Sequence, residues 1–122
     1  PHDRTMHPYG SASALLLHAY LPAEEQQAFM QRHPFWEHGA HVWKTEDALY
    51  EAMAETRKRG VAVPWKRNKH GQFAVAAPVL QPNQELVAIL GASQPSASLK
   101  ASERKAFIHL VKEAAAELSA EY

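Results

Sequence analysis

The chain of 122 residues is long enough for one domain with one hydrophobic core, because domains typically contain about 100–150 residues. Hydrophobic residues make up 46% and charged residues 21%, which excludes a disordered or membrane-spanning chain, and the absence of cysteine excludes disulfides, thiol nucleophiles and thiolate metal sites. Lys and Arg number 13, as do Asp and Glu, so no overall positive charge attracts the chain to nucleic acid.

Two helices are predicted at the start of the chain. Residues 11–20 are apolar almost all round, which indicates a helix that is buried on most sides. Pro22 ends this helix, because proline disfavours helical backbone in the residue before it. The same proline begins a second helix over residues 23–32, since proline fits the first turn, and the acidic pair Glu24 and Glu25 lies at the positive end of the helix dipole.

A loop rich in histidine, proline and aromatic residues is expected over residues 33–43. Thr45 then begins a third helix as its N-cap, and Gly60 ends it. The inward face of this helix is expected to consist of residues at the helical spacing i, i+3, i+4 and i+7, which are Leu49, Ala52, Met53 and Thr56. The large aromatic side chains of this region are expected in the core or in an interface: Phe35, Trp36, Trp43, Tyr50 and Trp65.

After Gly60 the pattern changes from helical to extended. A short strand is predicted over residues 61–63, a second over 72–80 and a third over 85–93, and the short turn between the last two indicates an antiparallel hairpin. A last helix follows with Ser102 as its N-cap and an inward stripe of Phe107, Ile108, Val111, Ala115 and Leu118. This order of elements predicts an α+β fold with an antiparallel sheet.

Several of these segments resemble one family. Residues 9–22 (YGSASALLLHAYLP) resemble the signature H-A-T-A-x-G-K-A-L-L-A-x-L-P of IclR-type transcriptional regulators. The stretches TRKRGVAV and GQFAVAAPVLQPNQELVAILGASQP are similar to the family's R-x-x-G-Y-A and G-x-x-C-I-A-A-P-V-F-D-x-x-G-x-V-V-A-A-L-S-V-S-G-P, and the final helix resembles the family's last helix. The resemblance covers nearly the whole chain.

The resemblance implies a GAF-like effector-sensing domain, with an antiparallel sheet flanked by helices, in a dimeric or tetrameric regulator that needs no cofactor. DNA is then bound only through a winged-helix domain, which nothing in this sequence resembles. The first strands of the sheet are expected upstream of Pro1 or from a partner chain, because a sheet without them has an exposed edge. The start of the chain has no initiator Met and no signal peptide, so we expect a piece of a longer, cytoplasmic protein.

The resemblance also implies the positions of an effector site: Ala12, Ser13, Pro64, Trp65, Ala74, Gly91 and Ser93. Several of these depart from the family, because Pro64 replaces an Asp, Ala74 a Cys and Gly91 the first of two serines. Ser93 keeps the second serine as a hydrogen-bonding contact. Small, weakly polar residues favour a bulkier or more apolar ligand. Trp65, followed by Lys66 and Arg67, would suit an anionic aromatic ligand.

Three other patterns suggest different chemistry. The pair His38 and His41 supplies only two of the three or four ligands that zinc needs, so no metal site is expected. A basic cluster runs from Arg57 to Lys69, but helix dipoles favour cations at a helix end, so we do not expect direct contact with nucleic acid. A serine triad lacks the G-x-S-x-G turn, so an enzyme is the weakest hypothesis. A ligand-free assembly module remains the alternative to a sensor.

Overall fold

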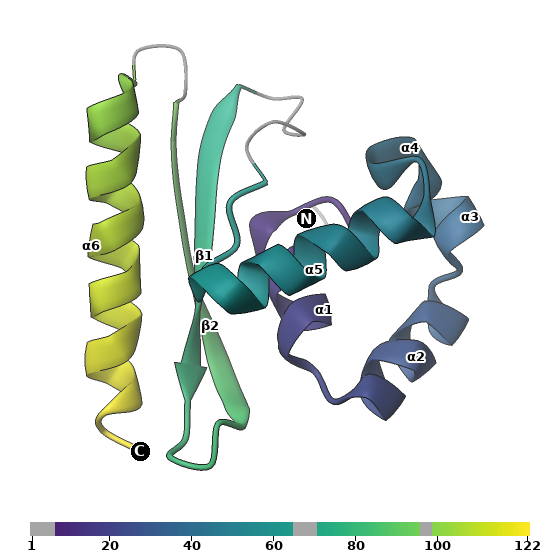
Figure 1. Ribbon diagram of the computed structural model, residues 1–122, viewed down its shortest axis with the longest axis horizontal. Coiled ribbons are helices and arrows are strands. Elements are labelled where there is room, and N and C mark those ends of the chain that lie inside the picture. The colour runs from purple at the N-terminus through teal and green to yellow at the C-terminus, as the bar shows by residue number, and fades with distance from the viewer. Residues whose placement is uncertain (1–6, 65–70, 96–98) are drawn as a thin grey trace, which may run out of the picture.

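A β-hairpin separates one long helix from a group of five helices (Figure 1). The computed structural model describes residues 7–64, 71–95 and 99–122. In chain order the elements are α1 (Ala12–Tyr20), α2 (Ala23–Arg32), α3 (Phe35–His38), α4 (Ala40–Trp43), α5 (Glu46–Arg59), β1 (Gln72–Leu80), β2 (Leu86–Pro95) and α6 (Ala101–Ser119). The predicted α+β fold with an antiparallel sheet is therefore confirmed. No helix in the described ranges is long and apolar enough to cross a membrane.

The two faces of the hairpin carry two separate hydrophobic cores. Strands β1 and β2 pair antiparallel, with Ala74 opposite Ser93 and Ala76 opposite Gly91. Successive side chains point to opposite faces. One face therefore packs on α6 through the β1 residues Phe73, Val75, Ala77 and Val79, and the other packs on α1 and α5 around Ala76.

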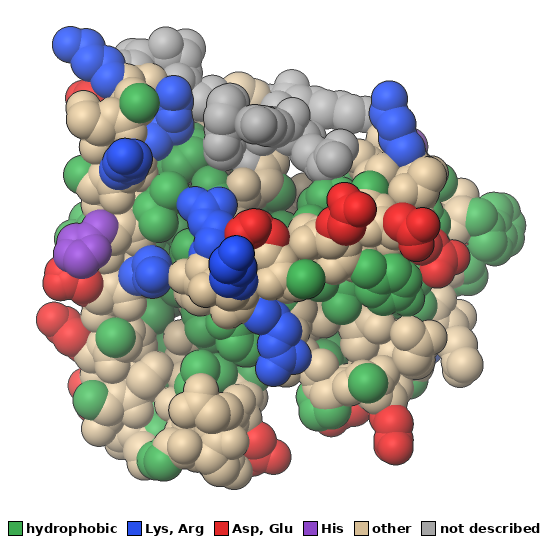
Figure 2. Space-filling view, in the orientation of Figure 1, with side chains coloured by type: hydrophobic (Ala, Val, Ile, Leu, Met, Phe, Trp, Pro, Cys, Tyr) green, Lys and Arg blue, Asp and Glu red, His purple; other side chains and the backbone are tan. Residues whose placement is uncertain are grey.

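Local capping explains the bounds of α1 and α5. The Ser11 side chain accepts a hydrogen bond from the Ala14 N–H at 3.0 Å, and Thr45 accepts one from the Ala48 N–H at 3.1 Å. Gly60 ends α5 in the left-handed region with φ of 76°, which glycine adopts without a steric penalty. Acidic side chains lie along α5 and basic ones at its end, as the helix dipole favours (Figure 2).

Helix α6 differs in detail from its prediction. It begins at Ala101 after Lys100, whose backbone N–H donates to the Glu103 carboxylate at 2.7 Å, so Ser102 is not the N-cap. Val111 and Ala115 are buried as expected, and Phe107 and Ile108 pack against the same core. The last position of the predicted stripe is wrong, because the Leu118 side chain is 41% exposed.

Residues 33–43 form two single-turn helices, α3 and α4, where a loop was predicted. Tertiary contacts hold them, because the Trp43 indole Nε1–H donates to the Tyr9 carbonyl at 2.9 Å and Phe35 packs edge-on to the Tyr9 ring. Trp43 and Phe35 are buried as predicted. Trp36 is 76% exposed, so it does not lie in the core of this chain, and its place in an interface stays a prediction.

The predicted strand at residues 61–63 is reduced to one bridge. Ala62 and Ala76 exchange two backbone hydrogen bonds of 2.8 and 3.0 Å, and the pairing goes no further within the described residues. Pro64 lacks an N–H and limits any extension of the pairing. In the same ranges no further strand pairs with the outer edge of β2, and the expectation of additional strands stays a prediction.

Candidate functional site

The hairpin register brings three of the expected site residues together. Ala74 lies directly opposite Ser93, and Gly91 precedes Ser93 by two residues on β2. Residues that oppose each other in an antiparallel pair share a face, and so do residues two apart along a strand. All three therefore face the side on which Ala76 packs against α1. The alternation of side chains along the strands and the register of the hairpin together form this side of the site.

Helix α1 supplies the opposite wall through Ser13. A Cβ atom placed on Gly91 would lie 3.2 Å from the Ser13 Oγ, so the serine hydroxyl rests directly against the glycine. The absence of a side chain at Gly91 thus lets α1 approach β2 closely. Ala12, the residue before Ser13, is only 6% exposed and packs into the core beside the site.

Pro64 comes from the segment that follows the Ala62–Ala76 bridge. Pro64 lies two residues beyond that bridge, and the pairing does not extend to it within the described residues. Pro64 and Ala74 are both half-buried. Trp65 lies outside the described residues.

Two hydroxyl groups, those of Ser13 and Ser93, belong to this face of the hairpin and the helix above it. Among the described residues neither the Ser13 nor the Ser93 hydroxyl has a hydrogen-bond partner. Ser13 is half-buried and Ser93 is exposed. A hydroxyl can both donate and accept a hydrogen bond. The face therefore combines small apolar groups with two available polar ones, which is the composition of a small-molecule site.

A buried polar network beside the site was not predicted from the sequence. The His18 ring accepts from the Gln26 amide at 3.0 Å through Nδ1, and its Nε2 lies 3.0 Å from the Pro8 carbonyl. Burial lowers the pKa of His18, and the approach of His33 lowers it further, although the Pro8 contact acts in the opposite direction. The only sequence signal was a histidine on the apolar helix of residues 11–20.

The Tyr9 ring stacks on His18 and is itself buried. Its hydroxyl donates to the His33 carbonyl. Burial raises the pKa of Tyr9 to about 12, with smaller contributions from Glu46 and Tyr50. The network therefore stays uncharged at neutral pH and holds α1 against the α2–α3 segment.

The two histidines considered as a metal clamp make different contacts in the structure. His38 Nε2 lies 2.8 Å from a Glu37 carboxylate oxygen, whereas the His41 ring meets His7 edge-on at 5.6 Å between ring centroids. In the ranges that the structure describes, no group of three His, Asp or Glu side chains is close enough to hold a metal ion.

Comparison with known proteins identifies a family. Residues 4–120 match the family described as bacterial transcriptional regulator IclR, C-terminal. Over 108 residues the chain is 32% identical to "Probable transcriptional regulator SauR" of Cupriavidus necator, a match that covers 88% of this chain and 43% of that protein. The chain thus spans less than half the length of this curated relative.

Solved structures share the fold. The C-terminal domain of the E. coli transcriptional regulator KdgR is similar with a TM-score of 0.73 and 18% identity, over 92% of this chain and 68% of that one. An IclR transcriptional regulator from Alicyclobacillus acidocaldarius gives a TM-score of 0.74 and 21% identity, over 93% of this chain and 45% of that one. With the family match over residues 4–120, these findings show that the chain belongs to the IclR family of bacterial transcriptional regulators, as part of their C-terminal domain.

Proposed function

We propose that this chain senses a small organic acid, which binds between the start of α1 and the face of the hairpin that carries Ala74, Gly91 and Ser93. The observation that carries the proposal is the pair of hydroxyls on Ser13 and Ser93, which lie on this one face among small apolar groups. Two hydroxyl donors suit a carboxylate, and the methyl groups around them suit an apolar body.

The sequence that follows Pro64 supports an acid as the ligand. Trp65, Lys66 and Arg67 come next in the chain, and they supply one aromatic ring and two cations. An aromatic ring stacks on an aromatic ligand, and a cation pairs with a carboxylate. We therefore extend the proposed class to aromatic acids.

Sensing requires that ligand binding favours one arrangement of the domain over another. Because Ser13 rests on Gly91, a ligand that enters here must shift the start of α1, and α1 packs on both strands and on α5. A tenfold change in DNA affinity requires the ligand to distinguish the two arrangements by about 1.4 kcal/mol. Self-association, DNA binding through a separate winged-helix domain and action in the cytoplasm complete the proposal, as the family likeness suggests.

One observation favours a ligand-free assembly module instead. The Ser13 hydroxyl already occupies the space above Gly91, and the Ala12 methyl is buried. If α1 does not move, the face serves only to hold the helix on the sheet. The two proposals differ in whether any small molecule stabilises the domain through the serine hydroxyls.

The deciding experiment is a thermal-shift screen of the full-length regulator against aromatic and aliphatic carboxylic acids. A ligand at 100 times its Kd adds about 2.7 kcal/mol to the free energy of unfolding, which gives a clear rise in melting temperature. The sensor predicts that Ser13→Ala and Ser93→Ala each reduce the shift, while Ser102→Ala, an exposed serine on α6, leaves it unchanged. A panel without any shift favours the assembly module, and a shift equal in all three variants would show that the acid binds away from the Ser13 and Ser93 hydroxyls.

A further inference from the structure

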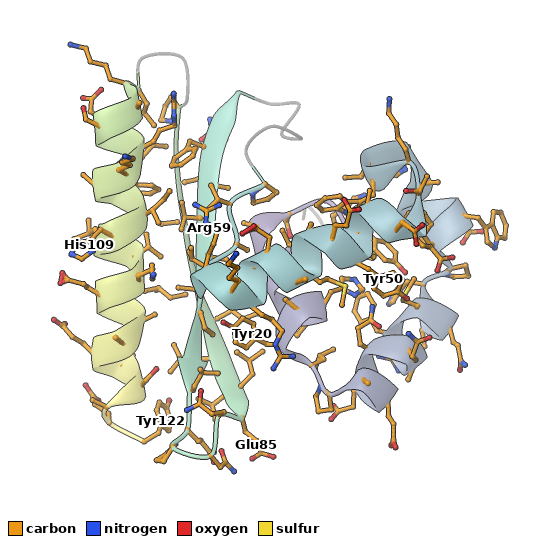
Figure 3. The ribbon with its side chains drawn as sticks, in the orientation of Figure 1. Tyr20, Tyr50, Arg59, Glu85, His109 and Tyr122 are labelled. Carbon is orange, nitrogen blue, oxygen red and sulfur yellow. The ribbon has the colours of Figure 1, made fainter. Side chains whose placement is uncertain are left out.

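A second hollow lies apart from the proposed effector site. It has a volume of about 530 Å³ and lies between the last turns of α6, the end of the hairpin, Tyr20 at the end of α1 and Gly60 at the end of α5. Tyr20 and Arg59 are labelled on this side of the molecule in Figure 3. This volume is within the range of small-molecule sites, about 300–1,000 Å³.

The outer edge of β1 explains why the hollow exists. Beyond the bridge at Ala76, no described strand covers this edge, and Pro78 has no N–H that would need a partner. The Leu80 N–H donates to the Ser119 hydroxyl at 2.9 Å, and Ser119 donates in turn to the Ala115 carbonyl at 2.9 Å. These bonds fix α6 to the hairpin at one end. The α6 residues beside the edge are small, so they leave space.

The wall along α6 is mostly apolar. Ala115, Ala116 and Ser119 line it from the last turns of the helix, and Ala120, the residue after the helix end, continues it. Lys112 lines the other end, about 12 Å from Ala120 at a rise of 1.5 Å per residue. The hollow is therefore a groove with a cation at one end and methyl groups along its α6 side, while Gln81 and Gln84 add amide groups on the side of the hairpin turn.

The cation end is the most basic part of this face. Among the described residues Lys112 is the one charged residue that lines the groove, and Arg57, Lys58 and Arg59 are exposed at the adjoining end of α5. Basic side chains gather at this junction of α5 and α6 in Figure 2. Among the described residues no carboxylate forms an ion pair with any of these four. Lys112 Nζ donates to the Arg59 carbonyl at 3.0 Å, which leaves two of its three N–H groups for a ligand.

We propose that this groove binds a medium-chain fatty acid. Its carboxylate pairs with Lys112, and its unbranched chain lies along Ala116 and Ala120 against Pro78 and the hairpin turn. Charge selects an anion, and the methyl groups along α6 favour an alkyl chain. The site is separate from the face that carries Ser93, so the proposal does not depend on the proposed effector site.

The test is a calorimetric titration of the full-length regulator with octanoate and with the neutral octanamide. Ala116→Phe fills the groove from an exposed helix position, and Lys112→Gln removes its cation; both are expected to weaken octanoate about tenfold. The matched controls are Ala106→Phe and Lys105→Gln, which are exposed on α6 outside the groove and should leave the affinity unchanged. Octanamide should bind about tenfold more weakly than octanoate.

Three results would overturn the proposal. The first is no saturable binding of octanoate by the unmodified regulator. The second is equal affinity in the Ala116→Phe and Ala106→Phe variants. The third is a loss of octanoate binding in Ser93→Ala with none in Lys112→Gln, which would place the acid in the effector site. Circular dichroism of each variant shows that the fold is retained.

Discussion

Adding a side chain at Gly91 tests the contact between α1 and β2 directly. A Cβ atom there meets the Ser13 Oγ at 3.2 Å, and the further methyl groups of valine must displace the start of α1. Overpacking of this kind costs about 1–3 kcal/mol. Replacing a glycine within a strand returns about 0.5–1 kcal/mol through the unfolded chain. We therefore expect Gly91→Val to lower the free energy of unfolding by about 1–2 kcal/mol.

A double-mutant cycle with Ser13→Ala identifies the cause of that loss. If the hydroxyl is the atom displaced, removing it should restore about 1 kcal/mol in the Gly91→Val background and much less in the unmodified chain. Ala92→Val is the matched control, because Ala92 is exposed on the other face of the same strand and should change stability by less than about 0.5 kcal/mol. Urea denaturation measures the four proteins of the cycle and the Ala92→Val control. Gly91→Val as stable as the parent, or no coupling with Ser13, would refute this packing.

Three further substitutions test other parts of the structure. Burial lowers the pKa of His18 below its ordinary value of 6.5, so the unfolded chain binds the proton more tightly and the free energy of unfolding falls from about pH 7 to about pH 5. His18→Gln should flatten this fall in a series of urea titrations, and an unchanged slope would contradict the assignment. Trp43→Phe removes the donor to the Tyr9 carbonyl and should cost about 1–3 kcal/mol by the same assay, whereas exposed Trp36→Phe should cost almost nothing. Gly60→Ala places a side chain on a residue with φ of 76° and should lower the free energy of unfolding by about 1 kcal/mol. An unchanged free energy of unfolding would show that the end of α5 does not depend on glycine at this position.

Local signals predicted the longer elements well. Ser11, Thr45 and Gly60 act where capping rules place them, because these interactions lie within a few residues of one another. The hairpin followed from two apolar stretches and a short turn. Its exact register did not, because the pairing shifts by one residue between Val79 and Leu80, next to the turn. The match between Ala74 and Ser93 therefore needed the structure.

The misses share a dependence on distant contacts. Helices α3 and α4 have four residues each, too few for local stability, and the Trp43–Tyr9 hydrogen bond spans 34 positions in the chain. Periodicity marked Leu118 as buried, but it does not report where the partner surface ends. The contact of Ser13 with Gly91 depends on how α1 crosses the sheet, which no local pattern encodes. The groove beside Lys112 was missed for the same reason, although the alanine run at residues 114–116 was a visible signal of space.

The most direct test of the central claim is to map the bound acid by nuclear magnetic resonance. The full-length regulator would be labelled with nitrogen and titrated with an acid that raises its melting temperature. The account predicts that the largest amide shifts at saturation occur at Ser13, Gly91 and Ser93 and at their neighbours on α1 and β2. Saturation with no shift at these three residues would contradict it.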